Sequence, residues 1–472
     1  MNEQAKAEAL ASFAHAVGST NVLTDPDLVA SYLSEPRGLY TGRALAIVRP
    51  GSTSEVAEVV KICAAAKIAI VPQGGNTGLV GGQTPDASGS AIVLSLTRMK
   101  KIREIDPLND TMVVEAGVTL AEAQAAAERV DRLFPLALAS EGTATIGGAL
   151  STNAGGVAVL AYGNARDLAT GVEAVIADGS VVNALTKLRK DNTGYDLKSL
   201  FFGAEGTLGV VTAAALKLYP RPRSRVTAFL GLTDPERALS LFRLARERLG
   251  QDVVSFELIS RIALDFVLAH GVDMRDPLEA PHPWYVLIEV ASQTGNGLEI
   301  AFETMLEEAL ERGLIDDAVL AANLAQRDDF WRLREFISDS QKFEGGSIKH
   351  DVSVPVGAVP EFIAEATAAA SAFLPAARVV AFGHIGDGNI HFNVSQPVGA
   401  DKQAFLDRWQ AMNEVVHAIV ARYGGSFSAE HGIGQLKRDL LRRAKDPAAL
   451  DVMRRIKAAL DPEGLMNPGK ML

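Results

Sequence analysis

Apolar and polar residues alternate in two different patterns along this chain. Between residues 226 and 322, short runs rich in β-branched and aromatic residues are separated by longer amphipathic stretches, a pattern that predicts alternating strands and helices. The predicted strands are 226–232, 253–259, 284–290 and 317–322, and the predicted helices include 235–249 and 297–313. This alternation is typical of an α+β domain, although periodicity does not distinguish parallel from antiparallel pairing.

The preceding part of the chain is distinguished by clusters of glycine. After predicted helices at 1–18 and 53–67, the glycines gather in PQGGNTGLVGGQ, EGTATIGGALSTNAGG and GAEGTLGVV, each beside a strand-like or helical stretch. Consecutive backbone N–H groups in such turns form concavities that bind anions, so these segments predict a cofactor-phosphate site. Turn glycines without a ligand explain one cluster but explain three poorly. None of the clusters matches a Rossmann or P-loop pattern.

A hairpin is predicted at FGHIGDGNIHFN, residues 382–393. If Asp-Gly occupies the two central turn positions, His384 lies directly opposite His391, about 5 Å away between Cβ atoms. Both imidazoles can then reach one metal ion, with Asn393 on the same face. Ile385 and Ile390 point to the other face, toward a core. Two histidines on a polar surface hairpin are an equally open interpretation.

Glu430 is the third candidate ligand, because it follows a predicted short strand and precedes two glycines, Gly432 and Gly434. Two histidines and one carboxylate leave an open position on Zn²⁺, which is typical of catalytic sites, and iron or manganese accept the same ligands. The adjacent His431 is a candidate general base or, alternatively, a structural histidine.

A helix near 327–343 places Arg334 and Ser338 four residues apart on one face, where they can hold a carboxylate together. In the predicted strand from Ser347, alternation puts Lys349 on the polar side. Solvated surface charge is the default interpretation of each of these residues.

Composition narrows the class of protein. With 472 residues, 48% of them hydrophobic, the chain is long enough for two or three domains. The 57 acidic residues outnumber the 46 basic ones, so there is no electrostatic footprint for nucleic acid or anionic membranes. The single cysteine, Cys63, excludes an intramolecular disulfide and suits a reducing cytoplasm. We expect neither an export signal nor a membrane span.

Taken together, these motifs resemble those of the FAD-dependent vanillyl-alcohol oxidase and p-cresol methylhydroxylase superfamily. The resemblance runs from ALAIVRPGSTSEVAEVV through the glycine clusters and GYDLKSLFFGAEGTLGVVT to GHIGDGNIHFNV and SAEHGIGQLKRDLL. It implies an α+β fold with a two-part FAD-binding domain, a cap domain that binds substrate and a C-terminal helical segment that returns to the flavin. The implied divisions are a helical segment at 1–40, the FAD domain at 41–220, the cap at 221–425 and the C-terminal segment at 426–472.

The resemblance also implies roles for individual residues. The metal ligands are His384, His391 and Glu430, the catalytic base is His431, and the substrate carboxylates are held by Arg334, Ser338, Lys349 and Asn393. At Ser338 the family pattern carries threonine, and the hydroxyl is kept. The implied cofactor-binding residues are Pro72, Gly74, Gly75, Asn76, Thr77, Gly78, Gly82, Ser140, Gly142, Thr145, Gly148, Asn153, Gly155, Gly206, Val210 and Asn467.

The implied activity is oxidation of a D-2-hydroxy acid to a 2-oxo acid, with proton removal by His431 and hydride transfer to noncovalent FAD, assisted by a divalent metal such as zinc. Lys349 favours a dicarboxylate, D-2-hydroxyglutarate, over D-lactate or glycolate. The implied electron acceptor is an electron-transfer flavoprotein or a quinone, and a homodimer is compatible with the pattern. A metal-dependent hydrolase and a noncatalytic flavin-binding module are the alternatives from other classes.

Overall fold

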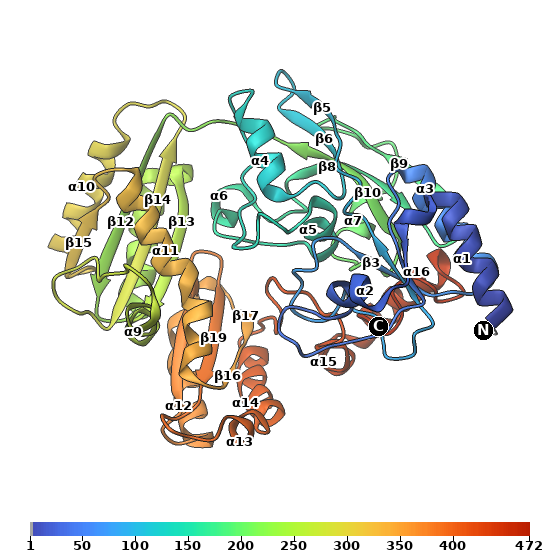
Figure 1. Ribbon diagram of the computed structural model, residues 1–472. Coiled ribbons are helices and arrows are strands. Elements are labelled where there is room, and N and C mark those ends of the chain that lie inside the picture. Colours follow the sequence, from blue (N-terminus) through green and yellow to red (C-terminus); the bar gives the residue numbers. More distant parts are fainter. Residues whose placement is uncertain (1–2) are drawn as a thin grey trace. The chain divides into compact units, whose positions relative to one another are not determined.

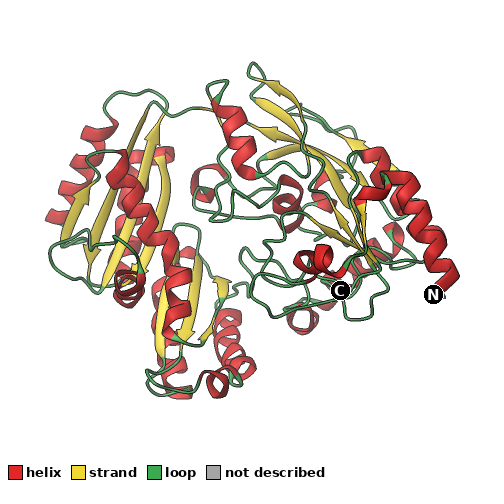
Figure 2. Ribbon diagram, in the orientation of Figure 1, coloured by secondary structure: helices red, strands yellow, loops and turns green. Residues whose placement is uncertain are grey.

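The computed structural model describes residues 3–472, which divide into two compact units. Unit 1 consists of Met1–Gly156, Gly163–Arg221 and Glu430–Leu472, and unit 2 consists of Val157–Tyr162 and Pro222–Ala429. Each unit contains both helices and strands (Figure 2). The predicted α+β class is therefore confirmed.

Unit 1 contains two larger sheets of different construction and a two-stranded antiparallel sheet formed by β7 and β11. The first has the order β1-β2-β4-β3, in which β2, β4 and β3 are parallel, and the second has the antiparallel order β5-β6-β10-β8-β9. The strands are β1 (Val22–Leu23), β2 (Ala46–Val48), β3 (Ile70–Gln73), β4 (Ile92–Ser95), β5 (Ile102–Asp106), β6 (Thr111–Glu115), β7 (Arg132–Leu133), β8 (Ala169–Val175), β9 (Val181–Ala184), β10 (Val210–Lys217) and β11 (Tyr219–Pro220). The helices are α1 (Glu3–Val17), α2 (Pro26–Leu33), α3 (Thr53–Ala66), α4 (Leu120–Glu128), α5 (Ile146–Thr152), α7 (Lys198–Phe201), α15 (Arg438–Ala444) and α16 (Pro447–Leu460).

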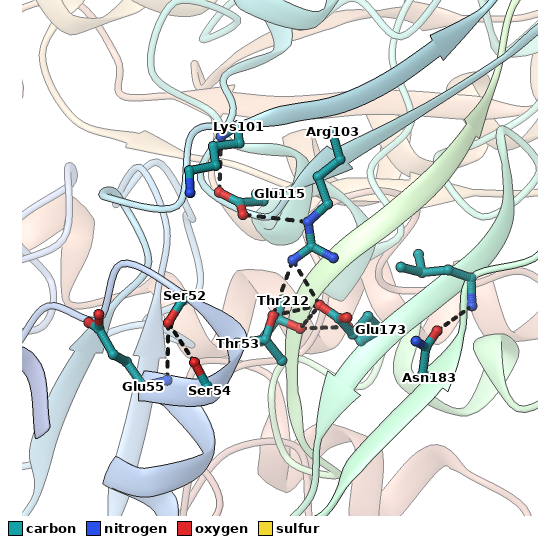
Figure 3. A network of polar contacts seen from close by, with 11 residues as sticks. Ser52, Thr53, Ser54, Glu55, Lys101, Arg103, Glu115, Glu173, Asn183 and Thr212 are labelled. Atoms are coloured by element: carbon teal, nitrogen blue, oxygen red, sulfur yellow. Dashed lines mark hydrogen bonds and ion pairs between the residues drawn. The ribbon is translucent and has the colours of Figure 1, made fainter.

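Helix α3 packs in one core with both larger sheets of unit 1 and lies beside α1 (Figure 1). Ser52 caps its start by accepting a hydrogen bond from the Glu55 N–H. At the same end, the Thr53 hydroxyl and the Arg103 guanidinium both donate to Glu173 of β8 (Figure 3). Burial raises the pKa of Glu173, but these donors outweigh it and hold that pKa below its usual value. The network fixes α3 on the antiparallel sheet.

Unit 2 is built on one sheet with the order β15-β12-β14-β13-β18-β19-β16, and β17 also pairs with β19. Its strands are β12 (Ser224–Leu232), β13 (Val253–Ser260), β14 (Trp284–Ser292), β15 (Asp317–Leu320), β16 (Ser347–Ile348), β17 (Asp351–Ser353), β18 (Arg378–His384) and β19 (Asn389–Ser395). Its helices are α6 (Val159–Tyr162), α8 (Pro235–Leu249), α9 (Arg261–His270), α10 (Leu298–Glu311), α11 (Leu324–Ser340), α12 (Val359–Phe373), α13 (Lys402–Leu406) and α14 (Trp409–Arg422). All of the pairings are antiparallel, which the periodicity left open.

Both faces of the unit 2 sheet are covered. Phe256 and Leu258 of β13 pack with α8, α10 and α12 on one face, whereas Ile259 of the same strand packs with α9 and α11 on the other. Because strand residues alternate between faces, a charged residue in the middle of such a strand is buried whichever way it points. This arrangement sets the environment of the candidate site.

Helix α11 begins three residues earlier than the predicted start at 327. The Asn323 side chain accepts a hydrogen bond from the Gln326 N–H, and this N-cap moves the first helical residue to Leu324. The predicted helix at 235–249 coincides with α8, where Asp234 caps and Pro235 occupies the first turn. Among residues 3–472, no helix is both long and apolar enough to cross a membrane.

Candidate active site

A pocket of about 320 Å³ in unit 1 lies where two of the glycine segments meet. Gln73 ends β3 and residues 74–76 follow it, whereas residues 142–145 lead into α5. Five of the predicted cofactor-binding residues line the pocket: Gly74, Gly75, Asn76, Gly142 and Thr145. The structure therefore brings together segments that are about 70 positions apart in the sequence.

The glycines in this pocket fall into two groups. A Cβ at Gly74 would collide with the Thr145 hydroxyl, and one at Gly75 would collide with the Thr143 carbonyl, so these two glycines let the segments approach each other. Gly142 has nothing within 4 Å of the position of its missing Cβ. The backbone at Gly142 is therefore open toward a ligand.

Two of the predicted cofactor-binding asparagines, Asn76 of the pocket and Asn467 of the C-terminal segment, have buried side-chain oxygens without a hydrogen-bond partner. The Asn76 amide donates to the carbonyls of Ser31 and Ser34, and its Oδ1 is left unpaired. The Asn467 amide donates to the carbonyls of Gly82 and Glu205, again leaving Oδ1 unpaired. Buried polar atoms are rarely left without a partner, so both atoms are suited to a polar ligand such as FAD.

The remaining predicted cofactor residues have structural contacts in unit 1. The Thr145 hydroxyl caps α5 by accepting from the Gly148 N–H, and Asn153 ends α5 in the left-handed conformation. Gly206 has a φ of +72° and packs on Pro72. Val210 is the first residue of β10, the Ser140 carbonyl accepts from Thr143 N–H, and Thr77 and Gly78 lie in the loop after β3.

The C-terminal segment returns to β3 and to the third glycine cluster. Met466 forms a parallel bridge with Ile70, and the Asn467 N–H donates to the carbonyl of the same residue. The carboxylate of Glu205, which lies in the third glycine cluster, accepts from the N–H groups of Ile433 and Gly434, both at 2.7 Å. Burial raises the pKa of Glu205 despite these two donors. Glu205 thereby fixes the segment that immediately follows the predicted base, His431.

Gly155 provides space for the predicted ligand Glu430 within unit 1. The Glu430 carboxylate accepts a hydrogen bond from the Gly156 N–H at 3.0 Å, and a Cβ at Gly155 would collide with it. The short strand predicted before Glu430 is reduced to a single bridge between Ser426 and Ser353.

The predicted pairing of the histidine hairpin in unit 2 is wrong by two residues. His384 lies opposite Asn389, and His391 lies opposite Phe382. A two-residue type I′ turn requires positive φ at both central positions, whereas Gly388 has a φ of +84° and Asp387 keeps a negative φ. The Asp387 side chain instead accepts from the Asn389 N–H, which closes a longer turn.

A shift of two residues leaves every side chain on its predicted face, because the strand period is two. His384, His391 and Asn393 share one face, and the rings of the two histidines are 5.7 Å apart between centroids. Ile385 and Ile390 are fully buried in the core on the opposite face, as predicted. The structure thus brings the two histidines together as diagonal neighbours.

Glu257 of β13 connects His384 to Arg334. Its Oε1 is 2.6 Å from the His384 Nδ1, and its Oε2 accepts from the Arg334 Nε at 2.7 Å. The carboxylate is completely buried. Burial raises the pKa of Glu257, but the contacts with His384 and Arg334 outweigh burial and lower that pKa to about 2. Sequence reasoning missed this residue; its only signal was a charge inside the apolar run VVSFELI.

Helix α11 and the strands of unit 2 gather the predicted carboxylate-binding residues. The Lys349 Nζ donates to the Ser338 hydroxyl at 3.1 Å and to the Ser338 carbonyl at 2.9 Å. Arg334 lies one turn before Ser338, with its guanidinium 4.9 Å from the centre of the Phe382 ring. The Asn393 side chain is buried and bridges the His350 N–H and Gln341.

Two known families match different parts of this chain. Residues 44–185 match the family described as FAD binding domain, and residues 221–471 match FAD linked oxidases, C-terminal domain. The chain therefore belongs to the FAD-linked oxidase family of FAD-dependent oxidoreductases.

Within this family, the chain is similar to D-2-hydroxyglutarate dehydrogenases. It is 37% identical to the D-2-hydroxyglutarate dehydrogenase of Stutzerimonas stutzeri (strain A1501) over 450 residues, which covers 95% of this chain and 96% of the relative. It is 38% identical to the mitochondrial D-2-hydroxyglutarate dehydrogenase of Bos taurus over 453 residues, which covers 96% of this chain and 81% of that one.

Solved structures show the same fold at lower identity. p-Cresol methylhydroxylase with substrate bound superimposes with a TM-score of 0.78 at 17% identity, covering 100% of this chain and 97% of the other. 4-Ethylphenol oxidase from Gulosibacter chungangensis gives a TM-score of 0.74 at 18% identity, covering 100% and 98%. These two matches show the fold, and the expected family resemblance is confirmed by the two family matches and by the relatives at 37% and 38% identity.

Proposed function

We propose that this protein oxidises D-2-hydroxyglutarate to 2-oxoglutarate as an FAD- and metal-dependent dehydrogenase. The observation that carries the proposal is the hairpin of unit 2, where His384 and His391 lie together and the Nδ1 of His384 is engaged by Glu257. The similarity to D-2-hydroxyglutarate dehydrogenases over nearly the whole chain supports this substrate.

FAD is proposed to bind noncovalently along the glycine segments of unit 1. The open backbone at Gly142 and the unpaired Oδ1 of Asn76 fit a large polar cofactor. No histidine lies between residues 44 and 220, so this region offers none for a covalent tether. When bound, FAD supplies a two-electron acceptor for the α-hydride of the substrate.

A divalent metal, with zinc as the first candidate, is proposed to bind His384, His391 and Glu430. The Ala429 N–H donates to the carbonyl of Asp351, which pairs with His391, and Glu430 is the next residue along the chain. A metal with three protein ligands keeps a position for substrate and supplies Lewis acidity to its hydroxyl and α-carboxylate oxygens.

His431 is proposed to take the hydroxyl proton of the substrate as general base. Glu205 supports this role, because its carboxylate accepts hydrogen bonds from the N–H groups of Ile433 and Gly434, which follow His431 in the sequence. The α-hydrogen leaves as hydride in the same oxidation, so that loss of one proton and one hydride converts the alcohol into the 2-oxo acid.

Arg334, Ser338, Lys349 and Asn393 are proposed to hold the two carboxylates of the substrate. Lys349 is proposed to distinguish the substrate classes. Its ammonium group donates to the Ser338 hydroxyl, and a second substrate carboxylate at this position would form an ion pair with it. D-Lactate and glycolate have no second carboxylate. A preference for them is therefore the alternative outcome of the test.

The electron acceptor is proposed to be an electron-transfer flavoprotein or a quinone, and the compartment a reducing cytoplasm. The compartment is supported by Cys63, the only cysteine, which is buried and whose thiol pKa is raised by that burial. A homodimer is the assembly to test by light scattering.

The function is tested by following flavin absorbance without oxygen. D-2-Hydroxyglutarate should bleach the spectrum rapidly, D-lactate should do so weakly, and prior treatment with a chelator should abolish the reaction. A colourless protein that does not take up FAD, or bleaching that is unaffected by chelation, contradicts the proposal.

Substrate class is tested with Lys349→Met. We expect kcat/KM for the dicarboxylate to fall about 100-fold, because a charge-assisted contact worth about 3 kcal/mol is lost, while activity on monocarboxylates is spared. Lys342→Met is the matched control, since Lys342 is an exposed lysine paired with Asp339. Equal losses on both substrate classes would make Lys349 a structural residue.

A further inference from the structure

The carboxylate of Glu257 has both oxygens engaged by residues that the proposed function uses. Oε2 accepts from Nε and Nη2 of Arg334, each at 2.7 Å, and Oε1 contacts Nδ1 of His384 at 2.6 Å. Its strand, β13, pairs with β18, which carries His384, and α11 places Arg334 on the same face of the sheet. One buried side chain therefore contacts two elements of the site.

We propose that Glu257 is a positioning residue that assigns Nε2 of His384 to the metal and holds Arg334 toward the substrate carboxylate. This inference rests on the proposed function. Because the Arg334 guanidinium donates to Glu257 through two N–H groups, Glu257 is the acceptor in this network. Nδ1 of His384 is then the donor to Glu257, and Nε2 is the ring nitrogen that can coordinate a metal. Such outer partners fix the orientation of metal-ligating histidines.

The same contact restricts Arg334. Two of its N–H groups, on Nε and Nη2, are held by one oxygen of Glu257, which leaves the other side of the planar guanidinium to bind a ligand. Glu257 therefore positions one residue of the proposed metal site and one residue of the proposed substrate site. Loss of Glu257 should weaken binding of the metal and of the dicarboxylate together.

A purely structural ion pair is the competing explanation, and the chain offers a matched control for it. Glu289 of the neighbouring strand β14 is also buried and also accepts a hydrogen bond from an arginine of α11, Arg327, at 2.8 Å. Its other partners are Arg225, Thr227 and Trp331, where Glu257 has His384. Glu257→Gln and Glu289→Gln thus remove equivalent charges from one sheet face.

The test measures the affinity of the metal-stripped flavoprotein for Zn²⁺ by competition with a chromophoric chelator. Glu257→Gln should weaken Zn²⁺ binding about 10- to 100-fold, the effect expected for an outer-shell partner, and Glu257→Asp should recover part of the loss. Glu289→Gln should bind Zn²⁺ as the wild type does. Wild-type affinity in Glu257→Gln, or an equal loss in both glutamine variants, overturns the inference.

A second measurement needs no substitution at Glu257 and remains valid if its variants fail to fold. In ¹⁵N-histidine-labelled holoenzyme loaded with Zn²⁺, the signals of His384, identified by their absence in His384→Asn, should show a protonated Nδ1 and a zinc-bound Nε2. Zinc on Nδ1 overturns the inference.

The two proposals fail in different ways. If wild-type protein binds no Zn²⁺, the metal part of the proposed function fails and the inference falls with it. If wild type binds Zn²⁺ and His384→Asn does not, but Glu257→Gln binds normally, only the inference is overturned.

Discussion

Glu257 and Glu289 are two buried carboxylates on one face of the same sheet, yet they lie in different surroundings. Arg327 and Arg334 are seven residues apart on α11, two helical turns, and each reaches one of the glutamates. Glu289 is completed by Arg225, Trp331 and Thr227. Glu257 is completed by His384, which the proposed function uses.

The difference shows that burial and charge do not by themselves identify a functional residue. Removing one partner of either ion pair should destabilise the fold, because an uncompensated charge in a packed interior costs several kcal/mol. Only the Glu257 pair should also affect chemistry. Comparing equivalent substitutions at the two positions therefore separates stability from activity.

The largest expected effect distinguishes the two arginines. Arg334→Met and Arg327→Met should each destabilise the fold by about 3–5 kcal/mol, since each removes an arginine from a buried carboxylate. Per folded molecule, Arg334→Met should also lose about 100-fold or more in kcat/KM, because a charged contact to the substrate worth about 3 kcal/mol disappears. Urea unfolding and flavin-normalised kinetics measure the two effects. Equal activity in the two folded variants would remove the functional distinction.

A smaller effect concerns acid stability at the structural pair. Burial raises the pKa of Glu289, but the charges of Arg225 and Arg327 outweigh it and bring the pKa below its ordinary value. Because the folded-state pKa is the lower one, this carboxylate stabilises the fold fully above the ordinary glutamate pKa. That contribution is lost as pH falls from there through the folded-state value.

Glu289→Gln cannot titrate at this position. The difference in unfolding free energy between wild type and Glu289→Gln should therefore be largest near neutral pH and should shrink as the solution is made acidic. Urea titrations at a series of pH values measure this difference. A gap that stays constant down to the most acidic condition would show that Glu289 does not titrate with a lowered pKa.

The smallest effect comes from one hydroxyl group. Thr227→Val keeps the shape of the side chain but removes the 2.9 Å hydrogen bond to Glu289, and should cost about 1–2 kcal/mol of stability. Activity per folded molecule should not change. A loss of activity in this variant would indicate that the Glu289 network also supports the site.

Much of the fold follows from local pattern. Helix α8 coincides with its predicted range because an N-cap, a proline and an amphipathic repeat all agree. The hairpin was placed correctly, but its pairing was not, since the φ of Asp387 and its side-chain bond to the Asn389 N–H cannot be read from the Asp-Gly pair alone. The histidines still share a face, because an even shift preserves side-chain direction.

The supporting carboxylates were beyond sequence reasoning for a different reason. Glu257 and Glu205 depend on partners 127 and 228 positions away, and local periodicity carries no information about such contacts. Their signals were a charge within an apolar strand and a carboxylate within a glycine cluster. Each became interpretable only when tertiary structure supplied its partners.

Gly155 has a consequence for how natural variation in this enzyme is read. A methyl group there would meet the end of the flexible Glu430 side chain rather than backbone, so the chain can accommodate it by moving that carboxylate. Expression level and melting temperature would then look normal while one proposed ligand was displaced. A glycine-to-alanine change, which a substitution table scores as mild, is therefore best judged here by metal content.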